Sequence, residues 1–377
     1  MIRIADILDR AGEYLTPADL EMIEKAYIFS ASVHKGQVRL SGEPYLIHPM
    51  EVAGLLVELK LDSATIVTGL LHDTVEDTLA TPDQIEESFG KDVVFLVNGL
   101  TKISKITFGS REERQAENFR KMILAMSSDI RILLIKLADR IHNMRTLEFQ
   151  TLEKQQLIAS ETLEVYAPLS NRLGIYWMEV ELEDIAFRYL YPEDYYELST
   201  QIAKKKDERK KYTEEVEAIL QKELQKSGLN GVDEGRPKHF YSIFKKMKEQ
   251  HINFNEVYDI TAFRIILDFS EKECYEALSI IHSLWKPVRG RFKDYIAIPK
   301  TNNYQSLHTT VIGPHAERME VQIRTRAMHE WAEKGIAAHW RYKEGGGLPR
   351  EDENEQINKL RDLIEIQQDL NDPREFM

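Results

Sequence analysis

The sequence predicts two folded domains in one chain, an all-α domain followed by a mixed α/β domain. Over residues 1–195, apolar residues recur at three- and four-residue spacing, as at Leu20 and Ile23, and alternating strand patterns are absent. Farther along, β-branched and partly alternating runs at Val257–Leu267 and Met319–Ile323 are typical of strands. A strongly charged stretch lies between the two patterns, which indicates a boundary between domains.

Composition limits the class of protein. The chain has 377 residues, 42% of them hydrophobic and 30% charged, which suits two globular domains and excludes a disordered or fibrous protein. With one cysteine, Cys274, and no export signal, we expect a cytoplasmic protein. No run approaches the roughly 20 apolar residues that span a bilayer, so no membrane partner is expected. A net charge of -13 argues against general coating of nucleic acid, so a polyanionic ligand must be met by local basic clusters.

Helices are expected in close succession through the first domain, residues 1–195. Thr16-Pro17 is a signal for a helix start. Further helices are expected at Pro49–Leu59, Ser63–Leu71, Pro82–Phe89, Asp92–Leu100, Glu113–Met126, Ile130–Arg145 and Leu152–Leu169. Residues 196–230, which contain the charged run Lys204–Lys211, are expected to form a solvated helical linker.

The second domain is expected to span residues 231–344. Helical patterns at Tyr241–Gln250 and Lys272–Trp285 fall among the strand patterns, which favours a mixed α/β fold. Gly345–Gly347 interrupts the chain, so residues 345–377 are expected to be a linker and an amphipathic helix, Glu355–Leu370.

One candidate metal site lies in the helical half. The segment His72–Asp77 (HDTVED) follows an apolar run, and if it is helical, His72 and Glu76 lie one turn apart. Carboxylates this close repel one another, and a divalent cation would offset the cost of burying them. A solvated acidic helix end is the alternative that this segment alone leaves open.

Two further segments add candidate ligands. Asp139 and Asn143 lie one turn apart at the end of an apolar stretch, and His48 follows Tyr45-Leu46-Ile47. Taken alone, a histidine such as His48 is more often a hydrogen-bonded core histidine than a metal ligand. Together, His48, His72, Asp73 and Asp139 make a set of imidazoles and carboxylates suited to Mn²⁺ or a similar ion.

These segments resemble the HD superfamily of metal-dependent phosphohydrolases. The superfamily is named for an adjacent His-Asp pair, which is His72-Asp73 in this chain. With VHKGQVR, SGEPY, HP and LADRIHNMRTL, they resemble the hydrolase domain of the long RelA/SpoT homologues, which removes pyrophosphate from the 3′ position of (p)ppGpp. The resemblance implies that His48, His72, Asp73 and Asp139 bind Mn²⁺ and that Glu76 and Asp77 position and activate the attacking water. It also implies that Arg39, Ser41, Asn143 and Thr146 surround the nucleotide, with Arg39 against guanine. Leu40 departs from the family, where a basic residue is common.

The α/β half carries basic clusters and separated carboxylates. One cluster runs from Arg236 to Lys248, and a second from Lys286 to Lys300, followed by Asn302–His308. Cations close to an aromatic ring suit a phosphate-rich ligand with a base, although exposed helix faces and chance loops give the same pattern. Asp259 and Glu320 lie on strand-like runs, where they either hold Mg²⁺ on a triphosphate or are structural acids at strand ends.

The segments GRPKHFYSIFKKM, YDITAFRIIL, GRFKDYIAIPKTNNYQSLHTT and MEVQIRT resemble the synthetase domain of the same family, which has a nucleotidyltransferase-like core and moves pyrophosphate from ATP to GTP or GDP. The resemblance implies that Arg236 and Arg264 sandwich adenine and that Lys238, Ser242 and Lys246 hold the phosphates of ATP. Asp259 and Glu320 would bind Mg²⁺, with Glu320 as the base for the 3′-hydroxyl. Tyr304 would stack on guanine, and the remaining acceptor-site residues would be Lys293, Lys300, Asn302, His308 and Gln322.

Both motif sets are complete, which favours a bifunctional enzyme with ATP, GDP or GTP, and (p)ppGpp as its ligands. Arg291–Asp294 matches the RxKD signature that accompanies use of Mg²⁺ in the family. The long relatives continue into a regulatory half, so contact with ribosomes or tRNA is expected only through that half, which this chain does not include. The alternatives are an HD-type nucleotide phosphohydrolase with a regulatory nucleotide-binding domain, or an interaction module on RNA or ribosomes.

Overall fold

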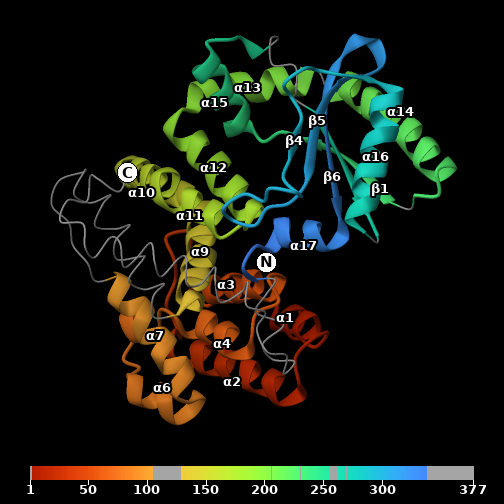
Figure 1. Cartoon of the computed structure of the whole chain (residues 1–377). Coiled ribbons are helices and arrows are strands. Elements are labelled where there is room, and N and C mark those ends of the chain that lie inside the picture. Colours follow the sequence, from red (N-terminus) through yellow and green to blue (C-terminus); the bar gives the residue numbers. More distant parts are fainter. Residues whose placement is uncertain are drawn as a thin grey trace, which may run out of the picture. The chain divides into compact units, whose positions relative to one another are not determined.

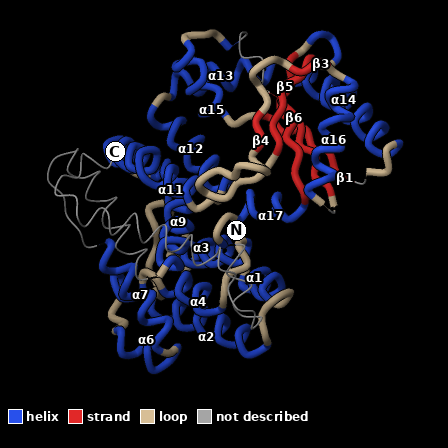
Figure 2. Tube along the Cα trace, in the orientation of Figure 1, coloured by secondary structure: helices blue, strands red, loops and turns tan. Residues whose placement is uncertain are grey.

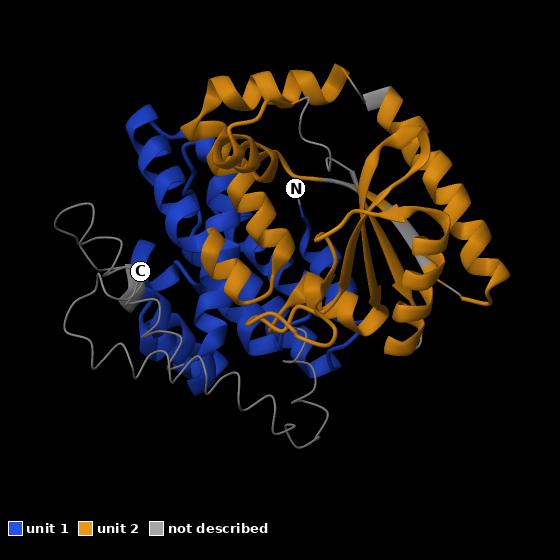
Figure 3. Ribbon diagram, turned by 45° about the horizontal axis from the view of Figure 1, so that its top comes forward, with its two compact units in different colours: residues 1–166, 337–377 blue, residues 167–336 orange. Residues whose placement is uncertain are grey.

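The chain forms two compact units. A computed structural model describes residues 2–104, 129–204, 206–229, 231–254, 261–268 and 270–337. Unit 1 comprises Met1–Tyr166 with Ala337–Met377, and unit 2 comprises Ala167–Ile336 (Figure 3). The strands gather in unit 2, whereas the described part of unit 1 is built from helices (Figures 1 and 2). The expected fold class, an all-α domain followed by a mixed α/β domain, is therefore confirmed.

The helices of unit 1 follow one another through short connections. They are α1 (Ile4–Ala11), α2 (Pro17–Val33), α3 (Ile47–Glu58), α4 (Ser63–Leu71), α5 (Thr74–Asp77), α6 (Pro82–Phe89), α7 (Lys91–Ser104), α9 (Ile130–Arg145), a 3₁₀ turn (Leu147–Phe149), α10 (Leu152–Glu161) and a π-helical turn (Thr162–Tyr166). An isolated β-bridge joins Val38 to Pro44 in the loop before α3.

Local sequence explains where these helices begin, and burial explains how they pack. Thr16 caps α2 in a capping box with Asp19, so the expected helix start at Thr16-Pro17 is confirmed. Asp62 caps α4 by accepting a hydrogen bond from Thr65 N. Nearly every residue of α4 is buried, and α9 buries ten of its own, so both helices run through the core of unit 1 (Figure 1).

Unit 2 places helices around a mixed sheet. Its helices are α11 (Ala167–Arg172), α12 (Tyr176–Leu190), α13 (Pro192–Lys204), α14 (Lys206–Lys226), α15 (Phe240–Gln250), α16 (Glu271–Leu284), a 3₁₀ turn (Pro314–Ala316) and α17 (Arg326–Lys334). The strands are β1 (Gly231–Pro237), β2 (Thr261–Leu267), β3 (Lys286–Pro287), β4 (Lys293–Asp294), β5 (Leu307–Ile312) and β6 (Arg318–Thr325). The sheet order is β1-β2-β6-β5-β3, with β4 paired to β5; β2 and β6 are parallel and the other pairs antiparallel.

The two faces of this sheet differ in chemistry because side chains alternate along each strand. Phe263 and Ile265 of β2 and Val321 and Ile323 of β6 join the core formed with α14 and α16. The intervening residues therefore face the other way, and Arg264 lies opposite Gln322 in the register of β2 and β6. The polar face of the sheet is the one available for a ligand.

The expected charged linker, residues 196–230, differs from the structure. Helices α13 and α14 cover most of it, and Val216, Leu220 and Leu224 of α14 are buried in the core against the sheet. The reason is a four-residue apolar repeat, which gives a mainly charged helix one buried stripe.

The boundary between the units also differs from the position expected at residue 195. Helices α12 and α13 belong to unit 2, because they pack against α15 through a cluster that includes Phe187, Leu198 and Phe244. The rings of Phe187 and Phe244 lie 4.5 Å apart between centroids. Helices α12 and α13 resemble the first domain in secondary structure, but this aromatic packing assigns them to unit 2.

Several expected elements can be compared with the structure. The helices expected near α3, α4, α6, α7, α9, α15 and α16 and the strand at Met319–Ile323 are confirmed, with shifts of a few residues. Strands β1 and β5 were not predicted. The expected helices Glu113–Met126 and Glu355–Leu370 and the start of the expected strand Val257–Leu267 lie outside the described residues. Within the described part of the chain, no helix combines the length and apolar character needed to cross a bilayer.

Candidate active sites

The metal cluster, which we define as His48, His72, Asp73 and Asp139, is assembled by the core helices of unit 1. His48 lies in the first turn of α3 and Asp139 in α9, while His72 and Asp73 occupy the break between α4 and α5. His48, His72 and Asp139 are buried, with 2%, 4% and 6% of their surfaces exposed. The four residues expected to bind a metal are thus brought together from distant parts of the sequence.

The segment His72–Asp77 is not one continuous helix. α4 ends at Leu71 and α5 begins at Thr74, so the expected spacing of His72 and Glu76 on one helix does not apply. The break turns Asp73 back toward the histidines, whereas Glu76 and Asp77 are exposed on α5. On one continuous helix, His72 and Glu76 would lie on the same face. The break allows His72 to be buried in the cluster while Glu76 is exposed.

The cluster is compact. His48 Nε2 lies 3.3 Å from Asp139 Oδ1 and 3.5 Å from Asp73 Oδ2, and His72 Nε2 lies 3.2 Å from Asp73 Oδ1. One ligand atom from each of His48, His72 and Asp139 lies within 4.8 Å of the others. The described residues therefore offer a site that could hold one cation.

Hydrogen bonds determine which ring nitrogens face the centre. His72 Nδ1 lies 2.8 Å from Gly69 O, which can only accept, so Nδ1 carries a proton and, in the neutral ring, the lone pair is on Nε2. Arg39 donates to His142 Nδ1 over 3.0 Å, so this nitrogen is an acceptor, and His48 Nδ1, 2.7 Å away, donates its N–H to it. The lone pair of His48 is therefore also on Nε2.

The two Nε2 atoms of His48 and His72 lie 3.2 Å apart. Two facing lone pairs repel unless a proton or a cation lies between them. Burial lowers the pKa of His48, whereas Asp73 overcomes burial and raises the pKa of His72 to about 9. The centre of the cluster thus favours positive charge, and its imidazoles and carboxylates fit a divalent metal ion.

The carboxylate of Asp139 is ionised despite its burial. Burial alone would raise its pKa, but the Lys136 ammonium 2.7 Å away and His48 hold that pKa well below the usual range. Asn143 Nδ2 also donates to Asp139 Oδ1 over 2.5 Å.

Three residues at the cluster were not among the predicted site residues: Lys136, His142 and Tyr45. The Tyr45 hydroxyl lies 2.8 Å from Asp73 Oδ2. The only signal for them is their place inside the motifs.

The four residues expected around the nucleotide differ in their contacts with the metal cluster. Arg39 donates to Asn143 Oδ1 over 2.8 Å, so both lie beside the metal cluster. The Ser41 hydroxyl donates to Glu43, and the Thr146 hydroxyl donates to the carbonyl of His142. Arg39 and Asn143 are thus tied to the cluster, while Ser41 and Thr146 make local bonds that a ligand must exchange or share.

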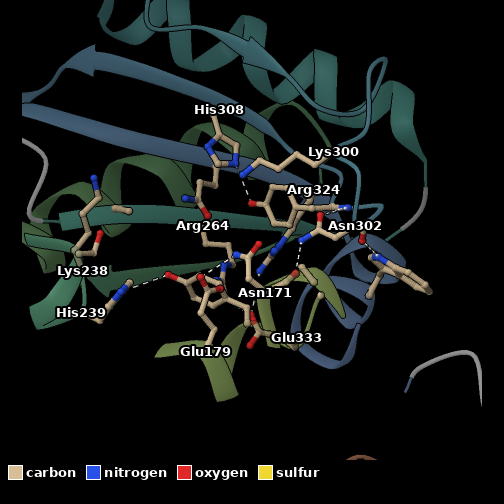
Figure 4. A pocket seen from close by; sticks show the side chains of 18 residues that line it. Asn171, Glu179, Lys238, His239, Arg264, Lys300, Asn302, His308, Arg324 and Glu333 are labelled. Carbon is tan, nitrogen blue, oxygen red and sulfur yellow. Dashed lines mark hydrogen bonds and ion pairs between the residues drawn. The ribbon is translucent and has the colours of Figure 1, made fainter. Parts of the chain in front are cut away.

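Unit 2 contains a cavity of about 230 Å³ on the polar face of the sheet (Figure 4). Figure 4 shows side chains from the sheet, from the loop of Lys300 and Asn302, and from the helical segment of Asn171 and Glu179 around one space. The expected synthetase residues that line it are Lys238, Ser242, Arg264, Lys300, Asn302, Tyr304, His308 and Gln322.

Glu320 lies beside this cavity, and its carboxylate contacts three side chains that line it. Its carboxylate is 3.2 Å from His308 Nδ1 and 3.6 Å from Lys238 Nζ, and it accepts a hydrogen bond from Gln322 over 2.9 Å. Burial would raise the pKa of Glu320, but the hydrogen bond from His308 and the charge of Lys238 lower it to about 2. A carboxylate that is ionised near neutral pH and lies next to an ammonium is suited to a site that handles cations and phosphates.

Cations surround the ring of Tyr304. Lys300 Nζ lies 5.1 Å from the ring centroid and the guanidinium of Arg324 lies 6.0 Å from it. The Tyr304 hydroxyl lies 2.9 Å from His308 Nε2. The tyrosine is therefore linked through His308 to Glu320 on β6. This joins the strand to the loop of residues 299–306, called the acceptor loop below.

A helical segment that precedes the expected second domain forms one wall of the cavity. Asn302 Nδ2 donates to Asn171 O over 2.8 Å, which fastens the acceptor loop to the end of α11. Gly174, at φ +75°, makes the turn into α12, and a Cβ there would meet Gly335 Cα at 3.1 Å. This wall contributes Asn171, Tyr176 and Glu179, none of which was predicted. Burial raises the pKa of the Glu179 carboxyl.

The remaining expected residues are not among the described residues that line the cavity. The described lining of the cavity does not include Lys246 of α15 or Lys293, which is exposed on β4. Arg236 of β1 pairs through its backbone with Ala262. Its side chain is not among those that the structure describes. Asp259 also lies outside the described residues. Arg324, Trp331 and Glu333 line the cavity without having been predicted, and Glu333 lies 3.1 Å from Arg264.

Comparison with known proteins finds two families, one matching the helical first part of the chain and one matching the α/β part that follows. Residues 26–176 match the HD domain family, and residues 235–347 match the family described as the region found in RelA / SpoT proteins. A "GTP pyrophosphokinase" of Myxococcus xanthus is 58% identical over 369 residues, which cover 97% of this chain and 48% of that protein. The "Bifunctional (p)ppGpp synthase/hydrolase SpoT" of Escherichia coli is 46% identical over 364 residues, which cover 97% of this chain and 52% of that protein.

The chain spans about half the length of these curated relatives. Among solved structures, a protein described as a metazoan ortholog of SpoT that hydrolyses ppGpp is 28% identical, covers 46% of this chain and 96% of its own, and has a TM-score of 0.34.

Proposed function

This chain belongs to the RelA/SpoT family, and from that premise we propose that it is a bifunctional cytoplasmic enzyme of the stringent response. It transfers the pyrophosphoryl group of ATP to the 3′-hydroxyl of GDP or GTP, and it hydrolyses the product, (p)ppGpp, to GDP or GTP and pyrophosphate. The observation that carries the proposal is the presence of two separate sites, the metal cluster in unit 1 and the cavity in unit 2.

Hydrolysis is assigned to the metal cluster. His48, His72, Asp73 and Asp139 would hold Mn²⁺, whose positive charge lowers the pKa of a bound water and offsets charge on the phosphate. Glu76 and Asp77, exposed on α5, would orient the attacking water and accept its proton. Arg39 and Asn143, which are hydrogen-bonded beside the cluster, support a nucleotide position next to the metal, completed by Ser41 and Thr146.

Synthesis is assigned to the cavity. Lys238, Ser242 and Lys246 would bind the phosphates of ATP, while Arg236 and Arg264 would hold adenine. Tyr304 would stack on guanine, and the other acceptor-site residues would be Lys293, Lys300, Asn302, His308 and Gln322. The contacts of Tyr304 with cations support a phosphate-rich ligand with a base at this place.

The transfer step needs a charge partner for the triphosphate and a base for the 3′-hydroxyl. Asp259 and Glu320 would hold Mg²⁺, which neutralises charge on the phosphates. Glu320 is anionic, as a base for the hydroxyl must be, and its ion pair with Lys238 would keep the lysine near the phosphates. Positioning and charge neutralisation are the main demands of phosphoryl transfer.

The test measures both activities in the unchanged chain and in two variants. Asp139→Asn should abolish Mn²⁺-dependent hydrolysis of (p)ppGpp and leave synthesis from ATP and GDP intact, whereas Glu320→Gln should do the reverse. Asp83→Asn, an exposed change on α6, is the matched control. No ATP-dependent product from the unchanged chain would instead favour an HD-type phosphohydrolase whose α/β half only binds a regulatory nucleotide. Loss of both activities in either variant would contradict the assignment of separate sites.

A further inference from the structure

The hydroxyl of Tyr45 lies between two carboxylates of unit 1. Its oxygen lies 2.8 Å from Asp73 Oδ2 and 2.5 Å from Asp77 Oδ2, so its one proton can be donated to either carboxylate. Asp73 belongs to the metal cluster, and Asp77 is one of the two exposed carboxylates assigned to the attacking water. One side chain from the loop before α3 therefore touches both groups, which stand at opposite ends of the short helix α5.

The ring of Tyr45 is held in place independently of these carboxylates. It stacks on the buried ring of His34, with centroids 4.6 Å apart and planes 16° from parallel. Tyr45 N donates to Gln37 O over 3.0 Å, and Gln37 Nε2 donates to Asp77 O over 3.0 Å. The position of the hydroxyl and the backbone of Asp77 are thus fixed by the same loop.

A phenol carries a single proton, and near neutral pH it keeps that proton because its ordinary pKa is about 10. It can therefore make one strong hydrogen bond at a time, although two carboxylate oxygens lie within reach. When a cation takes over the charge of Asp73, the proton of Tyr45 is left for Asp77. The hydroxyl then becomes a fixed donor that orients Asp77 relative to the metal cluster.

We propose that Tyr45 is a positioning residue for hydrolysis, which holds Asp77 at a set distance from Asp73 and hence from the metal-bound water. This inference rests on the proposed hydrolase function and adds a residue to it. Tyr45 forms no bond with the substrate in this assignment, and it acts through Asp77. Its removal should therefore slow the chemical step more than it weakens the binding of metal or substrate.

The test is Tyr45→Phe, which keeps the ring that stacks on His34 and removes only the hydroxyl. We expect kcat of Mn²⁺-dependent hydrolysis to fall about 10- to 100-fold, as when a hydrogen-bond partner of a metal site is removed. The KM for (p)ppGpp and the Mn²⁺ dissociation constant, measured by calorimetry without substrate, should stay within about threefold. Synthesis in unit 2 and the melting temperature should be unchanged. Tyr27→Phe on α2, a partly buried tyrosine of the same unit, is the matched control.

A double variant, Tyr45→Phe with Asp77→Asn, decides whether the two residues act as a unit. If Tyr45 acts through Asp77, the double variant should hydrolyse (p)ppGpp no more slowly than Asp77→Asn alone. Full additivity of the two losses would overturn the inference, as would an unchanged kcat in Tyr45→Phe. A fall in Mn²⁺ affinity large enough to account for the lost rate would also overturn it, because Tyr45 would then act on Asp73. If the unchanged chain does not hydrolyse (p)ppGpp with Mn²⁺, the proposed function itself fails, and the inference with it.

Discussion

Lys136 Nζ lies 2.7 Å from Asp139 Oδ2, and the two residues are one turn apart on α9. Their side chains are 19% and 8% exposed, so the ion pair is largely shielded from water. The same carboxylate accepts a hydrogen bond from Asn143 and lies 3.3 Å from His48 Nε2, so Lys136 supplies the ammonium among its neighbours. The metal-free cluster therefore depends on Lys136 to balance a buried negative charge.

Replacing Lys136 with Met should destabilise the metal-free protein more than the Mn²⁺-loaded protein. Removing one partner of a buried ion pair costs about 3–5 kcal/mol, because the other charge stays buried and unpaired. A bound cation compensates Asp139, so the loss should be smaller with Mn²⁺. Urea unfolding in EDTA and in Mn²⁺ measures both values, with the exposed change Lys154→Met as control. Equal destabilisation under both conditions would contradict this role of Lys136.

Removal of the metal should lower stability through the same cluster. Mn²⁺ at about 100 times its dissociation constant should raise the free energy of unfolding by about 2.7 kcal/mol, because it binds the folded state alone. In His72→Ala one imidazole of the cluster is lost, so most of this increment should disappear. Thermal unfolding with increasing Mn²⁺ gives the measurement, and a full increment in His72→Ala would place the metal elsewhere.

Glu320 should make stability depend on pH in a defined direction. Its folded pKa, lowered to about 2 by His308 and Lys238 against the effect of burial, lies below the ordinary value of 4.5. The ionised form thus stabilises the fold above about pH 4.5, and this contribution is lost as the pH falls toward 2. The stability difference between the unchanged chain and Glu320→Gln should therefore shrink as the pH falls from about 5 toward 2, as measured by urea unfolding. A difference that is constant over this range would be inconsistent with an ion-paired Glu320.

Tyr304→Ala should weaken the guanine nucleotide more than ATP. Stacking of a base on an aromatic side chain contributes about 1–3 kcal/mol, so the KM for GDP should rise by about one to two orders of magnitude. Tyr304→Phe keeps the ring and loses only the contact with His308, so it should retain most of the affinity. Separate titrations of GDP and ATP in steady-state synthesis test the prediction. Equal weakening of both nucleotides by the Ala variant would show that Tyr304 does not stack on guanine.

Local signals predicted the secondary structure best where a cap and an apolar repeat coincide. Thr16 with Asp19 marks the start of α2, and the stop of α4 at Leu71 follows the end of its apolar run. Strands β1 and β5 were missed because their stability comes from pairing with β2 and β6, which are distant in sequence. Such pairing leaves little trace in a short window of residues.

Motifs identified most of the site residues, but they did not determine how those residues are arranged. His48, His72, Asp73 and Asp139 converge because α3, α4 and α9 pack together. The wall formed by Asn171 and Glu179 could not be predicted, because these residues lie in a helical pattern that gives no sign of contact with a sheet. The contact is made through Asn302, which is 131 residues away from Asn171 in sequence.

The amino-acid order by itself determined the two fold types, most helices and the identity of the expected ligands, because caps, apolar periods and motif residues act over a few positions. Tertiary structure decided which helices join the sheet, which nitrogen of each histidine faces the centre, and that Tyr45 touches both Asp73 and Asp77. The physical reason is that hydrogen bonds and packing between distant segments depend on distances in space, which a linear pattern of residues does not contain.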